Sequence, residues 1–364
     1  MAQYIVIGGG VIGLSLVAEL SKKMINENDV IVLITPEDLH NPLNNNYNND
    51  KVIALSDINY EFLLNLGLNL TPSKVDTIRM LDDGSFCEFH AHNVGLSCLG
   101  YCVSWQEIYT QLCSQICHLK NVDIVKAKVH NIEEIQQNYP KYKHIFLCDG
   151  GNIQLPQIKY IEHDYHQYML ICRGKSNNYT QSTAYEFFTP YGALAVLPYE
   201  EEVICLFSML NQQAQECINN PSVLHEIIKQ YTAKQIDIKF SNNSIAKYPL
   251  KLRYVENNPY PNITVLGNAA HTIHPIMAQG LNLGLKNLQL LIKTMQYEGV
   301  TAYEKYKNAS KINIIQTTKF THYLALYSKH NLRFKHFGMI KKALWGFANQ
   351  LHPMQKIVFG FLQH

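Results

Sequence analysis

The chain has 364 residues, of which 47% are hydrophobic and 16% are charged, and its formal net charge is +2. This length allows about two domains, and the composition is too apolar for a disordered chain. The nearly neutral charge gives no reason to expect a nucleic-acid partner, so we predict none. No apolar run approaches the ~20 residues that span a bilayer. The first residues also lack the basic leader and cleavage site of a signal peptide.

The cysteines indicate reduced thiols in a cytoplasmic protein, because nine is an odd number in a chain without an export signal. Cys98 and Cys102 are four positions apart, as are Cys113 and Cys117, and neither pair has the two-residue gap of common zinc knuckles. The second pair lies in a helical apolar pattern, which favours core packing. We therefore predict no metal site.

The chain begins with the pattern of a parallel sheet. Residues 4–7 are apolar and β-branched, apolar side chains recur at helical spacing over 14–20, and residues 30–34 form a second apolar run. Together they predict a strand, a helix and a strand within about 30 residues. The asparagine-rich residues 41–50 that follow predict a surface loop, and residues 53–66 predict a helix.

Further along, the pattern changes twice. A helix is predicted over 105–119, and strands are predicted over 122–125, 126–129 and 144–147. Short apolar runs separated by turns over 165–207 then predict an antiparallel sheet. The chain returns to a buried parallel strand at 263–266, and everything from Leu285 onward is predicted to be helical. The first domain is therefore discontinuous, with the antiparallel domain inserted into it.

Gly8, Gly10 and Gly13 form a GxGxxG motif between the first strand and the first helix, with Val11 and Ile12 inside it. Such glycines permit a tight turn, close approach of a pyrophosphate and close packing of the helix on the strand. The motif therefore predicts dinucleotide binding, and the alternative is a glycine turn that serves packing only.

The end of the second strand is expected to carry an acidic residue that binds a ribose hydroxyl. By position this residue is Thr35, whose hydroxyl can form a hydrogen bond without a charge. Glu37, two residues further on, is the alternative partner.

A second glycine-rich segment carries a family resemblance. Residues 267–275 read GNAAHTIHP, and residues 278–284 read AQGLNLG. They resemble the second FAD motif of the aromatic-ring flavoprotein monooxygenases, most closely the ubiquinone-biosynthesis hydroxylases. The resemblance implies that Asn268 stands where the family's aspartate binds the ribityl chain. It also implies that the flavin ring is enclosed by Pro275, Gly280, Leu281 and Asn282.

Other segments resemble the same family in order, namely 53–56, 188–198 and 248–250, so the resemblance covers nearly the whole chain. Several charged family positions are replaced here. Lys51 and Gln106 stand for arginines, and Thr35, Asn268 and Asn287 stand for acidic residues. The histidines His271 and His274 fall in the flavin loop, which favours local hydrogen bonding over a metal site because no third ligand is nearby.

The fold that the resemblance implies is α/β, with a Rossmann-like FAD-binding domain, an inserted antiparallel-sheet substrate domain and C-terminal helices. The FAD-binding domain would comprise residues 1–75, 101–160 and 251–325. The substrate domain would comprise residues 76–100 and 161–250. Residues 326–364 would form the C-terminal amphipathic helices.

The implied activity is FAD-dependent hydroxylation of a prenylated phenol or quinone precursor in ubiquinone biosynthesis. NAD(P)H would bind transiently and reduce the flavin, and O₂ would then form a flavin hydroperoxide. Because the cofactor carries this chemistry, we assign no catalytic side chain. The alternative is a weakened or inactive family member that acts as a scaffold in a biosynthetic complex. A halogenase is disfavoured because Trp105 and Trp345 are far apart and form no WxWxI motif.

The last helical stretch, residues 332–361, interleaves aromatic and basic side chains. This pattern favours contact with an anionic membrane surface or with other ubiquinone-biosynthesis proteins, and the alternative is a helix packed on the body. We therefore predict a cytoplasmic protein that is peripheral to the inner membrane.

Overall fold

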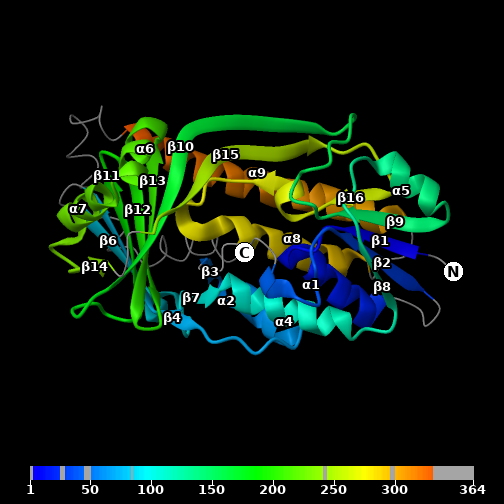
Figure 1. Cartoon of the computed structure of the whole chain (residues 1–364), viewed down its shortest axis with the longest axis horizontal. Coiled ribbons are helices and arrows are strands. Elements are labelled where there is room, and N and C mark those ends of the chain that lie inside the picture. The colour runs from blue at the N-terminus through cyan, green and yellow to red at the C-terminus, as the bar shows by residue number, and fades with distance from the viewer. Residues whose placement is uncertain are drawn as a thin grey trace.

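The computed structural model describes residues 3–24, 29–44, 51–82, 85–240, 244–295 and 300–330. Within these residues the strands form a parallel sheet, a larger mixed sheet and a small antiparallel sheet. The parallel and mixed sheets lie at opposite ends of the molecule (Figure 1). This arrangement agrees with the predicted α/β fold, which combines a Rossmann-like part with a second, sheet-rich part.

The parallel sheet is built from continuous apolar runs, which suit strands covered on both faces. Helices α1 (Val11–Glu19) and α4 (Trp105–Cys117) pack on one face, and α5 (Ile132–Asn138) packs on the other. On α4 the buried residues Ile108, Leu112 and Ile116 follow the predicted helical spacing. The strand order is β16 (Ile263–Val265), β9 (Tyr142–Leu147), β1 (Gln3–Ile7), β2 (Val30–Thr35) and β8 (Val122–Lys126).

The mixed sheet contains the predicted antiparallel strands, but β11 pairs in parallel with β5. The long strands β10 and β15 run from this sheet toward the parallel sheet (Figure 1). The strand order is β17 (His271–Thr272), β15 (Ala246–Asn257), β10 (Lys159–Lys175), β13 (Glu202–Leu210), β12 (Gly192–Tyr199), β11 (Thr183–Thr189), β5 (Thr77–Asp82) and β6 (Ser85–His90), and β14 (Lys239–Phe240) also pairs with β10.

The remaining strands and helices connect the two ends. The small sheet has the order β3 (Val52–Leu55), β7 (Gly100–Ser104) and β4 (Ser73–Val75). The other α-helices are α2 (Asp57–Asn65), α3 (Ala91–Val94), α6 (Asn211–Asn219), α7 (Pro221–Thr232), α8 (Gln279–Thr294) and α9 (Val300–His330). The short 3₁₀ and π segments are η1 (Leu20–Met24), η2 (Pro42–Asn44), η3 (Gly267–Ala269) and η4 (Ile276–Ala278).

Two sequence predictions were wrong in detail. The helix predicted over 53–66 begins only at Asp57, because the preceding Val52–Leu55 forms strand β3 against β7, some fifty residues away in the sequence. The second strand predicted over 126–129 does not form, because β8 ends at Lys126. The aromatic, basic segment 332–361 lies outside the described residues.

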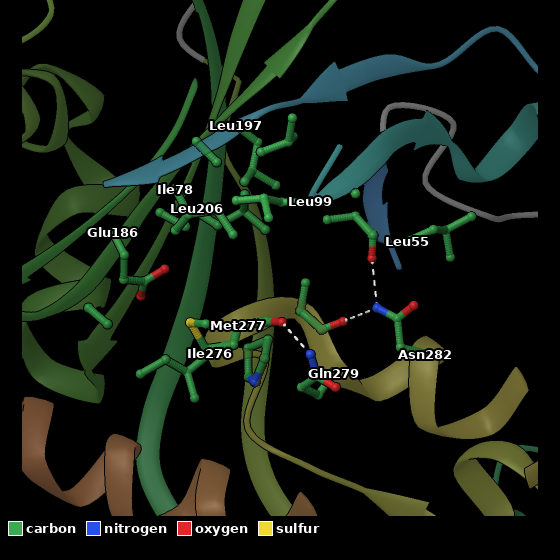
Figure 2. Close-up of a pocket in the computed structure, with 18 of the residues that line it drawn as sticks. Leu55, Ile78, Leu99, Glu186, Leu197, Leu206, Ile276, Met277, Gln279 and Asn282 are labelled. Carbon is green, nitrogen blue, oxygen red and sulfur yellow. Dashed lines mark hydrogen bonds between the residues drawn. The ribbon is translucent and has the colours of Figure 1, made fainter. Parts of the chain in front are cut away.

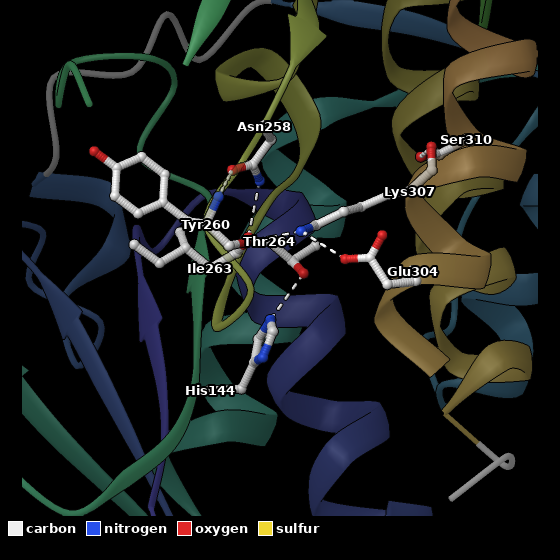
Figure 3. A network of polar contacts seen from close by, with 8 residues as sticks. All are labelled: His144, Asn258, Tyr260, Ile263, Thr264, Glu304, Lys307 and Ser310. Atoms are coloured by element: carbon white, nitrogen blue, oxygen red, sulfur yellow. Dashed lines mark hydrogen bonds and ion pairs between the residues drawn. The ribbon is translucent and has the colours of Figure 1, made fainter. Parts of the chain in front are cut away.

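Helix α9 is attached to the edge of the parallel sheet by a polar network (Figure 3). The ammonium of Lys307 donates to the carbonyl oxygen of Tyr260 across 2.8 Å and to Glu304 across 3.2 Å. Within the sheet, His144 of β9 forms a hydrogen bond with the Thr264 hydroxyl of β16 across 2.8 Å. Burial lowers the pKa of His144 to about 3, so this histidine is a neutral structural residue. In the described part of the chain, no helix is long and apolar enough to cross a membrane.

Candidate cofactor cleft and adjoining pocket

The first glycine of the GxGxxG motif occupies a position where only glycine fits. Gly8 has φ +112°, and a Cβ atom added there would lie 2.3 Å from the carbonyl oxygen of Cys148. Its backbone N–H donates to Ile34 across 2.9 Å. The turn out of β1 is therefore pressed against both neighbouring strands of the sheet.

The other two glycines of the motif differ from each other. A Cβ added to Gly13 would lie 2.0 Å from the carbonyl oxygen of Gly8, so Gly13 allows α1 to pack on the turn. A Cβ added to Gly10 would meet no atom within 4 Å. Gly10 is the N-cap of α1 and no side chain caps this helix, so its first N–H groups are available to a ligand.

A cleft of about 830 Å³ opens in front of this helix terminus. Its volume lies within the range of small-molecule and cofactor sites. The cleft is bordered by the glycine turn, by the loop after β9 and by the segment that begins α8. Of the residues proposed from the sequence, those that line it are Gly8, Gly10, Val11, Ile12, Lys51, Asn268, Gly280 and Leu281.

Thr35 does not line the cleft. Its side chain is fully buried, and a Cβ added to Gly9 would lie 2.5 Å from the threonine hydroxyl oxygen. That hydroxyl donates to the carboxylate of Glu37, which does line the cleft. Glu37 is therefore better placed than Thr35 to bind a ribose hydroxyl, and Thr35 orients its carboxylate.

Lys51 brings a positive charge to the cleft. Its ammonium lies 5.9 Å from the centre of the Tyr248 ring, and both residues border the cleft. Although the lysine is exposed to the cleft, the surrounding protein removes enough water to lower the pKa of Lys51. An anionic ligand would offset this desolvation. Gln106 does not line the cleft, but its neighbour Trp105 does and stacks on Tyr109 with ring centres 4.7 Å apart.

The loop after β9 begins with an Asp-Gly pair, Asp149-Gly150. The carboxylate of Asp149 accepts hydrogen bonds from the backbone N–H groups of Gly151 and Ile153, which holds the loop in place. The guanidinium of Arg253 lies 3.7 Å from the centre of the Tyr160 ring and donates to the Gly151 carbonyl oxygen across 3.3 Å. These residues shape the cleft wall through contacts between distant segments, for which the local sequence gives no signal.

The segment before α8 forms the opposite wall. Gly267 has φ +58°, and an added Cβ would lie 3.1 Å from the Ile12 side chain of α1. The next residue, Asn268, is exposed in the cleft. The glycine motif and the second glycine-rich segment, more than 250 residues apart, therefore meet across one site, as the sequence resemblance implies.

The turn into α8 contains backbone strain. Met277 has φ 61° and Ala278 has φ 53°, both in the left-handed region that favours glycine. Gln279 stabilises the turn by donating from its side chain to the Met277 carbonyl oxygen across 3.0 Å (Figure 2). Pro275, proposed from the sequence as a flavin contact, lines the pocket on the inner side of this turn.

Asn282 secures the turn to the small sheet. Its side-chain N–H₂ donates to the carbonyl oxygens of Ala54 and Ala278, both across 2.9 Å (Figure 2). Its side-chain oxygen accepts from the Ser56 backbone and the Asn59 side chain, also across 2.9 Å. These four bonds use the full capacity of the amide. The Asn282 side chain is thus a positioning group for the turn, with no donor or acceptor left for a ligand.

A second, smaller pocket of about 120 Å³ adjoins the cleft on the inner side of this turn. Figure 2 shows that the pocket lies between the mixed sheet and the turn into α8. Its walls are mostly aliphatic and come from the mixed sheet, the small antiparallel sheet and the turn. The apolar side chains labelled in the figure are Leu55, Ile78, Leu99, Leu197, Leu206, Ile276 and Met277.

Two titratable side chains of this pocket have strongly shifted pKa values. Burial raises the pKa of Glu186 to about 8 and lowers the pKa of His274 to about 3. His274 accepts from the Ile276 backbone N–H across 3.2 Å and is neutral. Glu186 was not among the site residues predicted from the sequence, although an acidic residue within the apolar run of β11 was a usable signal.

The cysteines are buried or half-buried, as packing residues are. All nine cysteines are free thiols, and Cys113 lies in the core between α4 and the parallel sheet. Among the described residues no group of three or more histidine, cysteine or acidic side chains gathers as a metal ion would need.

Comparisons with known proteins agree with this geometry. Residues 153–298 match the family model described as "FAD binding domain". The ubiquinone hydroxylase UbiM of Neisseria meningitidis is 23% identical over 98% of this chain and 83% of its own length. The 3-demethoxyubiquinol 3-hydroxylase of Escherichia coli is 27% identical over 50% of this chain and 44% of its own length.

Solved structures share the fold. The p-nitrophenol 4-monooxygenase PnpA of Pseudomonas putida superposes with a TM-score of 0.72 at 12% identity, over 100% of this chain and 98% of its own. PqsL of Pseudomonas aeruginosa, a probable FAD-dependent monooxygenase, gives 0.71 at 14% identity, over 92% and 98%. The chain therefore has the fold of the FAD-dependent monooxygenases. Within that class, the predicted resemblance to the ubiquinone-biosynthesis FAD hydroxylases is confirmed.

Proposed function

We propose that this chain is an FAD-dependent monooxygenase that hydroxylates the ring of a prenylated phenol or quinone precursor in ubiquinone biosynthesis. The observation that carries the proposal is the adjacency of two cavities. A cleft built on GxGxxG lies on one side of the turn into α8, and an apolar pocket lies on the other. A cofactor in the first cavity and an aromatic ring in the second would lie next to each other, on the two sides of this turn.

The residues of the cleft fit FAD. The uncapped N-terminus of α1 offers N–H groups for the pyrophosphate, and the open space at Gly10 lets it approach. Glu37 would bind the ribose of the adenosine. Asn268 would hydrogen-bond the ribityl chain, and the backbone of Gly280 and Leu281 would border the flavin ring.

Bound FAD supplies the redox chemistry by which O₂ is activated for insertion into an aromatic ring. The chain's own task is to orient the ring and exclude water. Leu99, Leu197 and Leu206 give the pocket an apolar wall, and the turn at Met277 closes it toward the cleft. The Asn282 side chain keeps this turn in place through its four hydrogen bonds.

The reductant, partners and location are further parts of the proposal. NAD(P)H would bind transiently, since no second GxGxxG motif lines either of the two described cavities. A prenylated substrate resides in the bilayer, so we place the protein at the inner membrane surface, beside other ubiquinone-biosynthesis proteins.

The test is direct. Purified protein is supplied with FAD, NADH or NADPH and a short-chain prenylated phenol, and the product is analysed by mass spectrometry in the presence of ¹⁸O₂. We expect a phenol that has gained one labelled oxygen atom. A folded protein that binds no FAD and forms no product would refute the proposal and favour the scaffold alternative.

A further inference from the structure

Glu186 lies within β11 and extends from the mixed sheet into the small pocket (Figure 2). Its side chain is the one carboxyl group among the described residues that line this pocket. Only 7% of the residue is exposed. The neighbouring walls are aliphatic, with Ile78 and Leu206 beside it in the figure. A carboxyl group in such surroundings has lost water and must find its hydrogen bonds elsewhere.

Among the described residues, no side chain or backbone group forms a hydrogen bond or ion pair with the Glu186 carboxyl. Burial alone accounts for its raised pKa, with no hydrogen bond and no charged neighbour contributing. By contrast, the arginines of the same sheet are paired with other glutamates: Arg79 with Glu88 and Arg173 with Glu202. An unpaired buried polar group destabilises the fold, so a polar ligand atom in the pocket would relieve that penalty.

Several other polar groups of the pocket are already engaged within the protein. The Ser208 hydroxyl donates to the Ala193 carbonyl oxygen across 3.1 Å and accepts from the Ala193 N–H across 3.0 Å. His274 accepts from the Ile276 backbone N–H through Nδ1, so its neutral ring carries the proton on Nε2, which has no partner among the described residues and can only donate. The Asn282 amide is fully used within the protein, as described above. Glu186 is therefore the side chain of this pocket best able to accept a hydrogen bond from a hydroxyl group on an otherwise apolar ligand.

The size of the pocket selects the kind of ligand. A volume of about 120 Å³ is close to that of a single six-membered aromatic ring with a small substituent, and it leaves a prenyl chain to lie elsewhere. Aliphatic walls suit the faces of such a ring, and a carboxyl oxygen suits a hydroxyl group on its edge.

We propose that Glu186 is a specificity-determining residue that accepts a hydrogen bond from the phenolic hydroxyl of the ring bound in this pocket. This inference rests on the proposed function and adds the residue that distinguishes a phenol from a ring without a hydroxyl group. Glu186 would hold the ring in one orientation, so that the same ring edge always faces the turn into α8.

The recognition should depend on pH in a definite way. Both forms of the carboxyl can accept a hydrogen bond from the phenol O–H, but the ionised form is the stronger acceptor. The other titratable side chains of the pocket do not change charge between pH 6 and 9. The pKa of His274 is about 3, and burial raises the pKa values of Tyr101 and Tyr185 above that of free tyrosine. Phenol affinity should therefore rise through pH 8 because of Glu186.

The experiment compares two ligands and three variants. The ligands are 2-prenylphenol and prenylbenzene, which lacks the hydroxyl group, and binding is measured by calorimetry. Glu186→Met fills the space without an acceptor, and we expect about a tenfold loss of phenol affinity with prenylbenzene affinity unchanged. Glu186→Gln keeps an acceptor but should remove the pH dependence. Ile78→Val, a change in the same wall, should affect both ligands equally.

The inference is overturned if Glu186→Met weakens both ligands equally, if it weakens neither, or if the unmodified protein binds neither ligand. Flavin binding is measured separately by absorbance on the same samples. A protein that binds no FAD but still discriminates the two ligands through Glu186 would refute the proposed function and leave this inference standing. A yellow protein that binds both ligands equally well would refute this inference and leave the proposed function standing.

Discussion

The side chain of Asn59 donates to the side-chain oxygen of Asn282 across 2.9 Å, and this buried contact joins α2 to α8. Asn59 also donates to the Asn282 carbonyl oxygen across 3.1 Å and accepts from Gln289 across 2.9 Å. The turn that separates the cleft from the pocket is therefore held by a network of amides. Its position depends on contacts between residues more than 200 positions apart in the sequence.

Replacing Asn282 with alanine should destabilise the protein strongly. Four hydrogen bonds are lost, two of them buried and two partly buried, and at about 1 kcal/mol each the free energy of unfolding should fall by about 3–4 kcal/mol. Urea denaturation measures this change. Asn258→Ala is the control, since Asn258 forms two partly buried bonds, to Ile263 and Tyr260, away from the cleft. Equal losses for the two variants would contradict the assigned role of Asn282.

Replacing Ala278 with glycine should stabilise the fold. Ala278 adopts φ 53°, a conformation that costs a residue with a Cβ roughly 1–2 kcal/mol and costs glycine almost nothing. After the loss of chain entropy, we expect a gain of about 0.5–1 kcal/mol in thermal or urea unfolding. Ala214→Gly, in the middle of α6, should have the opposite sign. A loss of stability in both variants would contradict the backbone strain assigned to Ala278.

Alanine substitutions at two glycines of the GxGxxG motif should affect different properties, FAD affinity in one case and stability in the other. Gly10→Ala places a methyl group in open space on the cleft side of α1, so stability should change by less than about 1 kcal/mol. FAD affinity should nevertheless fall at least about tenfold, because the methyl occupies the approach of the pyrophosphate. Gly13→Ala would put a Cβ 2.0 Å from the Gly8 carbonyl oxygen and should lower stability by about 2 kcal/mol or more.

Flavin titration and urea unfolding on both variants check this pair. Gly10→Ala with unchanged FAD affinity would show that the motif serves packing alone, which is the alternative that the sequence left open.

The stability of the protein should fall as pH rises because of Glu186. Its pKa is about 8 in the folded chain against an ordinary value of 4.5, so between these values the folded chain retains a proton that the unfolded chain has lost. Unfolding free energy should therefore decrease by up to about 1.4 kcal/mol per pH unit across this window. Glu186→Gln should remove this slope.

Urea unfolding at pH 5.5 and pH 7.5 measures the difference between the variant and the unmodified chain. The exposed α5 residue Glu133, changed to glutamine, provides the matched control and should leave the slope unchanged. A slope that persists in Glu186→Gln would place the origin of the pH dependence elsewhere.

The sequence predicted local patterns well and long-range contacts poorly. The β1–α1–β2 unit follows from apolar periodicity and three glycines, which are local properties. The strand at Val52–Leu55 was assigned to a helix because its apolar spacing is ambiguous and its partner β7 is distant. Thr35 occupies the expected end of β2, but only the structure shows its side chain buried behind Glu37.

Glu186 illustrates the same limit at the level of the site. Its place in the pocket depends on the pairing of β11 with β12, which follows it directly in the sequence, and with β5, which lies far before it. An acidic residue in an apolar strand indicates that something polar faces it, but not what that is. The meeting of the two glycine segments was predictable only through the family resemblance.

The most direct test of the account is the visible absorption spectrum of the purified protein after incubation with excess FAD and removal of free cofactor. We predict a yellow protein with about one FAD per chain, and a clear loss of bound flavin in Gly10→Ala at unchanged folding. Folded protein that remains colourless under these conditions would contradict the assignment of the cleft as an FAD site.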